Sequence, residues 1–69
     1  METTDYMANC IFRILAAPCH PSRATDRAKQ LAYVCYLAHK AEDMGRAHRE
    51  LIDMTNDYEA GKYAPTKGE

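Results

Sequence analysis

The chain has 69 residues, a formal net charge of −1, and a composition that is 46% hydrophobic and 28% charged. A chain of this length buries only about 60% of its unfolded surface, which argues against an enzyme with a separate substrate pocket. The lack of a basic excess argues against direct nucleic-acid binding, because phosphate contacts dominate that affinity. The composition therefore predicts one small folded helical domain over residues 1–69 that is not an enzyme.

The sequence shows no pattern typical of a membrane or secreted protein. No apolar stretch approaches the about 20 residues that a membrane helix needs. Residues 1–5 carry acids where a secretory signal would carry bases. The three cysteines are an odd number without C-x-x-C spacing, which predicts free thiols. We therefore expect a cytoplasmic protein without membrane contact.

The first predicted element is a short helix over residues 4–17. Met7, Ile11, Ile14 and Leu15 have the spacing of one helical face. Prolines at positions 18 and 21 then end the helix, because proline disfavours helical structure in its own interior and in the residue before it.

The second predicted element is a long helix over residues 22–59. Ser22 is a suitable N-cap, no proline follows before residue 65, and Gly61 supplies a stop signal. The polar tail, 61–69, is predicted to fray. The alternative is a three-helix fold with a turn at Gly45, although the residues that follow this glycine are poor N-caps.

A heptad-like seam runs through Gly45 and favours the unbroken helix. Its members are spaced alternately by three and four residues: Val34, Leu37, Ala41, Met44, His48, Leu51, Thr55 and Tyr58. A polar residue at a seam position, here His48, is expected to fix register. Beside the seam lies a second apolar stripe: Ala24, Ala28, Leu31, Cys35 and Ala38. The fold class predicted from these patterns is an all-α helical hairpin.

The length of the seam predicts a second copy of the chain. The short helix covers only about 21 Å of a helix that would be about 57 Å long. In a monomer the remaining stripe would face water: Leu51, Ile52, Met54 and Tyr58. Residues 13–40 carry five basic residues against one acid, and residues 41–59 carry six acids against two arginines. An antiparallel homodimer through the seam would cover the stripe and pair these opposite charges.

The candidate partner-binding residues lie on the first half of the long helix: Arg23, Arg27, Lys29, Tyr33, Tyr36 and Lys40. Tyrosine is common at interaction hot spots because it joins a large apolar ring to a polar tip. Arginines in the first turns of a helix can hold an acidic group, or they can form ion pairs in the dimer. The alternative for the tyrosines is packing against the short helix.

No catalytic residue, metal site or cofactor is predicted. Zinc needs four ligands in paired spacing, whereas His39 and His48 lie nine residues apart, on opposite sides of a continuous helix. Cys19 and His20 lack the further groups that a nucleophilic pair requires, so we expect an ordinary loop there.

The chain is small, places a short helix, a turn and a long helix in that order, and lacks a catalytic set. In these features it resembles the small helical proteins with which bacteriophages disable host machinery. The phage quorum-sensing anti-activators are one such family. The resemblance implies a non-enzymatic inhibitor in the host cytoplasm that binds a transcription regulator, and also a pilus-assembly ATPase. It implies no particular residue as a contact.

A second resemblance is local and gives an alternative function. The long helix opens with Pro21, Ser22 and Arg23, and Ala28 follows. This segment resembles the hairpin of phage proteins that sequester cyclic oligonucleotide signals. This resemblance implies a ligand sponge that blocks host immune signalling, with Arg23, Arg27 and Lys29 holding phosphates. The sequence departs from this resemblance at Tyr33 and Val34, where those phage proteins are expected to have an acidic pair.

Overall fold

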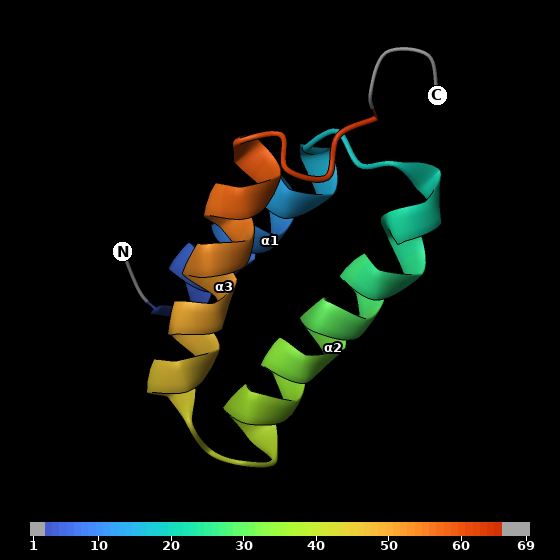
Figure 1. Ribbon diagram of the computed structural model, residues 1–69. Coiled ribbons are helices and arrows are strands. Elements are labelled where there is room, and N and C mark those ends of the chain that lie inside the picture. The colour runs from blue at the N-terminus through green and yellow to red at the C-terminus, as the bar shows by residue number, and fades with distance from the viewer. Residues whose placement is uncertain (1–2, 66–69) are drawn as a thin grey trace.

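The computed structural model describes residues 3–65, which fold into three α-helices, as Figure 1 shows. These are α1 (Thr3–Ala16), α2 (Ala24–His39) and α3 (Met44–Glu59), and a short 3₁₀ helix, η1 (Pro21–Arg23), leads into α2. No strand occurs in the described range, so the all-α prediction is confirmed. The first helix lies within one residue of its predicted bounds.

The predicted long helix over residues 22–59 is wrong, and the three-helix alternative is confirmed. The chain leaves α2 at Lys40 and enters α3 at Met44. Glu42 adopts a left-handed conformation (φ 52°), and the Asp43 backbone N–H donates to the Leu37 carbonyl at 2.8 Å. The reversal therefore precedes Gly45, which is the second residue of α3.

Asp43 is the physical reason for a new helix start. Its carboxylate Oδ1 accepts a hydrogen bond from the Arg46 backbone N–H at 3.0 Å, the geometry of an N-cap. The prediction considered only the residues after Gly45 as caps and so missed the aspartate two positions before it. The seam spacing gave no warning, because two helices that share one core satisfy it as well as one helix does.

Replacing Asp43 by alanine is expected to lower the free energy of unfolding by about 1 kcal/mol, because the N–H groups at the start of α3 lose their acceptor. Urea titration followed by circular dichroism measures the change. Asp43→Asn keeps an acceptor oxygen and should retain most of the stability. Equal stability of the alanine variant and the wild type would contradict the capping role.

The core forms because α1 and α2 both pack against α3, while they scarcely contact each other. The α2 and α3 helices run antiparallel (Figure 1). Every helix contributes to one cluster of buried side chains: Cys10, Ile14, Val34, Leu37, Ala47, Leu51, Met54 and Tyr58.

This core overturns the exposure predicted for the second half of the long helix. Leu51, Met54 and Tyr58 are buried inside a single chain, because α3 folds back onto α2 and α1. Five of the eight seam residues are buried in this way: Val34, Leu37, Leu51, Thr55 and Tyr58. The predicted dimer seam is therefore largely the chain's own core, and the homodimer itself stays a prediction.

The remaining seam residues do not form a continuous interface either. Ala41 and Met44 are exposed at the connection between α2 and α3. His48 is half-buried, and its ring packs edge-on against that of Tyr6 in α1, with ring centroids 4.9 Å apart. Its contact is thus with another helix of the same chain.

The chain after α3 is tied to the fold as far as the structure describes it. Gly61 takes a left-handed turn (φ 81°), and the Tyr63 ring centroid lies 4.7 Å from that of Tyr58. The His20 backbone N–H donates to the Tyr63 carbonyl at 2.8 Å. Fraying was predicted for 61–69. Residues 61–64 instead form turns with hydrogen bonds, and residues 66–69 lie outside the described range.

An exposed ion pair joins α1 to α3. Arg13 donates through Nε to Glu59 Oε2 at 2.9 Å, and its Nη2 bonds Oε1 of the same carboxylate. The hydrogen bond from Arg13 lowers the pKa of Glu59. The pair therefore adds stability above the ordinary glutamate pKa of about 4.3, and this stability is lost as pH falls through the lowered value.

Glu59→Gln is expected to be less stable than the wild type at neutral pH, and the difference should shrink at acidic pH, as the pH falls through the lowered pKa of Glu59. The effect is small because both side chains are well exposed. Unfolding free energies at neutral and acidic pH test this expectation. A difference that persists undiminished in acid would assign the effect to packing instead of charge.

Candidate functional site

The six predicted partner-binding residues all lie in or beside α2, but the structure divides them into two groups. Arg23 and Arg27 are half-buried near the start of the helix. The other four are exposed, and their spacing places them along one side of α2: Lys29, Tyr33, Tyr36 and Lys40.

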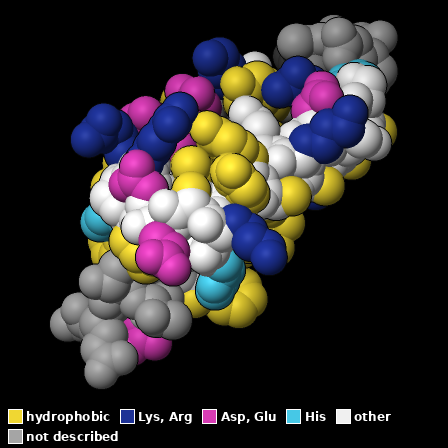
Figure 2. Space-filling view, turned by 90° about the horizontal axis from the view of Figure 1, so that it is seen from below, with side chains coloured by type: hydrophobic (Ala, Val, Ile, Leu, Met, Phe, Trp, Pro, Cys, Tyr) yellow, Lys and Arg dark blue, Asp and Glu magenta, His cyan; other side chains and the backbone are white. Residues whose placement is uncertain are grey.

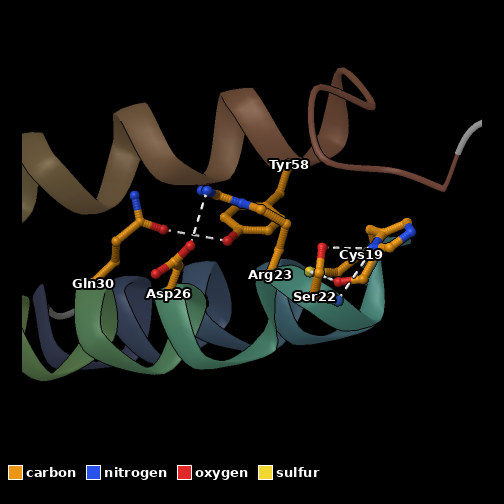
Figure 3. A network of polar contacts seen from close by, with 7 residues as sticks. Cys19, Ser22, Arg23, Asp26, Gln30 and Tyr58 are labelled. Atoms are coloured by element: carbon orange, nitrogen blue, oxygen red, sulfur yellow. Dashed lines mark hydrogen bonds and ion pairs between the residues drawn. The ribbon is translucent and has the colours of Figure 1, made fainter.

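Arg23 is engaged within the fold. Its Nη1 bonds the Asp26 carboxylate at 3.0 Å, and its guanidinium carbon lies 4.4 Å from the centre of the Tyr63 ring. Figure 3 shows the pair of Arg23 and Asp26, and beside it Tyr58 from α3 reaches α2 and donates its hydroxyl to Gln30 Oε1 at 3.2 Å. Arg23 therefore fastens the chain after α3 to the start of α2. The cyclic oligonucleotide hypothesis, which needs this guanidinium for phosphate, stays a prediction.

The two tyrosines point to solvent. Tyr36 is 54% exposed and Tyr33 is 42% exposed. Their rings lie nearly parallel, inclined by 15° with centroids 6.4 Å apart. The alternative that they pack against the first helix is therefore wrong, because α2 turns a different side to the core.

A cation from α3 joins this surface. The Arg46 guanidinium carbon lies 6.0 Å from the centre of the Tyr33 ring. We call this surface the tyrosine face and define it by five residues: Lys29, Tyr33, Tyr36 and Lys40 of α2 and Arg46 of α3. Sequence reasoning missed Arg46 because it follows Tyr33 by thirteen residues, and only the reversal between the helices brings the two together.

A shallow groove of about 260 Å³ borders the tyrosine face between α2 and α3. Its lining joins polar and apolar side chains from both helices: Lys29, Gln30, Tyr33, Val34, Glu50 and Met54. The surface thus offers two phenol hydroxyls, three cations and one carboxylate beside apolar ring area. Protein interfaces commonly combine an apolar centre with a polar rim in this way.

A second groove, also of about 260 Å³, lies between α1 and α2 and is mainly apolar. Its lining residues are Met7, Ala8, Ile11, Val34, Cys35, Ala38, His39 and Met44. Phe12 and Leu15 of α1 are 71% and 50% exposed, although the sequence pattern placed Leu15 on the packed face. In Figure 2, seen from the end where α2 joins α3, hydrophobic side chains gather near the middle of the face with charged ones around them.

Metal ligands and free thiols are the other groups that could take part in chemistry. Among residues 3–65, no three His, Cys, Asp or Glu side chains gather where they would hold a metal ion. Cys10, Cys19 and Cys35 are free thiols, of which only Cys35 is exposed. None of the described helices has the length and apolar character needed to cross a membrane.

Comparison of the chain with protein-family models, with curated proteins and with solved structures finds no match. The function of this protein is therefore inferred from its surface. The resemblances to phage anti-activators and to phage ligand sponges remain hypotheses.

Proposed function

We propose that the protein is a non-enzymatic inhibitor that binds a host protein through the tyrosine face and occludes the surface which that protein needs. The observation that carries the proposal is the exposure of Tyr33 and Tyr36 side by side on one helix. Neither ring belongs to the buried core. Exposed aromatic rings on a rigid helix lose little conformational entropy when they bind, which favours their use as anchors.

The charges around the tyrosines indicate the chemistry of the target. Lys29, Lys40 and Arg46 surround the rings with positive charge, so the matching surface carries acidic groups at its rim and an apolar groove at its centre. Docking a helix face into a groove excludes the groove's normal partner by steric overlap. A transcription regulator of the quorum-sensing kind, and a pilus ATPase, are proposed as targets from the resemblance.

The Tyr33→Ala/Tyr36→Ala double variant is expected to bind the target at least about 30-fold more weakly, because one hot-spot residue contributes 2 kcal/mol or more. Quantitative capture from host cells identifies proteins held by the wild type, and calorimetry with each purified protein gives the affinity. Circular dichroism should stay unchanged, since neither ring lies in the core.

Two matched variants separate the contributions at this face. Arg49→Ala, exposed on α3 outside the tyrosine face, should bind like the wild type. Tyr33→Phe/Tyr36→Phe keeps the apolar rings and removes only the hydroxyls, so it should lose less affinity than the alanine pair. Undiminished binding by the folded alanine variant would exclude the tyrosine face as the docking surface.

A further inference from the structure

We propose that the groove between α1 and α2 is a self-association surface, and that its occupant is α1 of a second copy of this chain. This apolar face is distinct from the tyrosine face and consists of Met7, Ala8, Ile11, Phe12, Leu15, Cys35, Ala38 and Met44. The dimer seam predicted from the sequence shares Met44 with this face and the buried Val34 with the lining of the groove.

The side of the molecule where α1 and α2 adjoin is open. Both α1 and α2 use α3 as their packing partner and scarcely contact each other, so their neighbouring flanks stay uncovered. No lysine, arginine, aspartate or glutamate lines the groove between them, and His39 is its one ionisable side chain besides the Cys35 thiol. Extended apolar surface without charge is typical of an interaction site in a small soluble domain.

On this side an apolar groove lies beside apolar side chains that project from α1. Ala8 and Ile11 line the groove, and Phe12 and Leu15 continue the same stripe of α1 as exposed side chains. The spacing of these four residues, i, i+3, i+4 and i+7, defines one side of a helix. Any occupant must fill the groove and also cover the Phe12 ring, which is 71% exposed.

A second copy meets both requirements at once. In a two-fold arrangement with the two α1 helices antiparallel, the Phe12 stripe of each copy enters the groove of the other. The helix macrodipoles then oppose each other, which is the favourable orientation. The lengths also match, since α1 has 14 residues and α2 has 16.

The available area suits a dimer of modest strength. Over the about 21 Å length of α1, two helices that each present about 10 Å of width form a face of roughly 400 Å² in projection. Projecting side chains enlarge the accessible area, so two such faces bring the total near the about 1,000 Å² that a specific interface requires. We therefore expect a dissociation constant in the micromolar range, on the order of 1–100 µM.

Sedimentation velocity from about 5 µM to about 500 µM tests the proposal. The wild type is expected to pass from monomer to dimer over this range. Phe12→Asp, which places a charge in the middle of the apolar face, should stay monomeric throughout with unchanged circular dichroism. Tyr36→Asp, matched in substitution but on the tyrosine face, should dimerise like the wild type.

The exposed thiol gives a second measurement that does not depend on a variant in the interface. With Cys19 replaced by serine, Cys35 is the exposed thiol and Cys10 is buried. Labelling of Cys35 by a maleimide should slow at least about fivefold between the dilute and the concentrated protein, because the partner copy covers the groove.

A wild type that remains monomeric at about 500 µM would overturn the proposal, and so would a folded Phe12→Asp variant that dimerises normally. If Tyr36→Asp stayed monomeric, the interface would lie on the tyrosine face, and this result would also overturn the proposal. Phe12→Asp is read out by the oligomeric state in sedimentation, whereas the tyrosine variants of the proposed function are read out by affinity for the target. Failure of this proposal is therefore distinguishable from failure of the proposed function.

Discussion

Leu51→Ala is expected to lower the free energy of unfolding by about 2–5 kcal/mol. Leu51 is fully buried in α3 and belongs to the core cluster to which α1 and α2 also contribute. Truncation removes apolar contacts and leaves a cavity that the neighbouring helices fill only in part. A chain of 69 residues has a total stability of roughly 3–10 kcal/mol, so the variant loses a large share of it. Urea titration followed by circular dichroism measures the loss.

Leu15→Ala is the matched control, because it removes the same atoms from a side chain that is half exposed. In dilute protein, where the chain is monomeric, its effect should stay within about 1 kcal/mol. The loss caused by Leu51→Ala should also be the same in dilute and concentrated protein, since the core belongs to one chain. Equal effects of the two substitutions, or a Leu51 effect that depends on concentration, would contradict the three-helix core.

Tyr58→Ala is expected to be similarly damaging, with a loss of about 3–5 kcal/mol. The ring is fully buried and packs against Tyr63, so its removal leaves a cavity and also frees the chain after α3 from the core. Burial raises the pKa of the Tyr58 hydroxyl above its ordinary value of about 10, so the hydroxyl remains the donor to Gln30 up to a higher pH than an exposed tyrosine would. Thermal and urea unfolding measure the loss.

Tyr58→Phe separates packing from the hydrogen bond. It keeps the ring and removes only the hydroxyl, so the expected loss is about 0.5–1.5 kcal/mol. Gln30→Ala should add little to Tyr58→Phe, because the two substitutions remove the same bond. A phenylalanine variant as unstable as the alanine variant would show that the hydroxyl, and not the ring, dominates at this position.

Local sequence rules predict the helical segments well because their causes are local. Pro18 ends α1 wherever the rest of the chain lies, and Gly61 permits the left-handed turn after α3 for the same reason. The start of α3 also has a local cause in Asp43, which the sequence displays. The prediction of one long helix followed the seam and overlooked Asp43 as a cap, although seam spacing is equally compatible with one helix and with two.

The candidate site was predictable only in part. Tyr33 and Tyr36 share a helix face by their spacing, but their exposure depends on which side of α2 packs against α3. The spacing of Ala8, Ile11, Phe12 and Leu15 also defines one side of a helix, but the sequence pattern had placed Ile11 and Leu15 on the packed face. Only the groove that α1 and α2 leave between them makes this side of α1 part of a candidate interface.

The sequence by itself determined that the chain is helical, where its first helix begins and ends, and that two tyrosines and two lysines share one side of a helix. Those properties follow from backbone geometry and from side-chain spacing within a few residues. Only the tertiary structure decided that the apolar seam is covered within one chain, that Arg46 joins the tyrosines, and that Phe12 is left outside. A helix can bear several apolar stripes, and the stripe that is buried depends on which distant segments of the chain pack against it best.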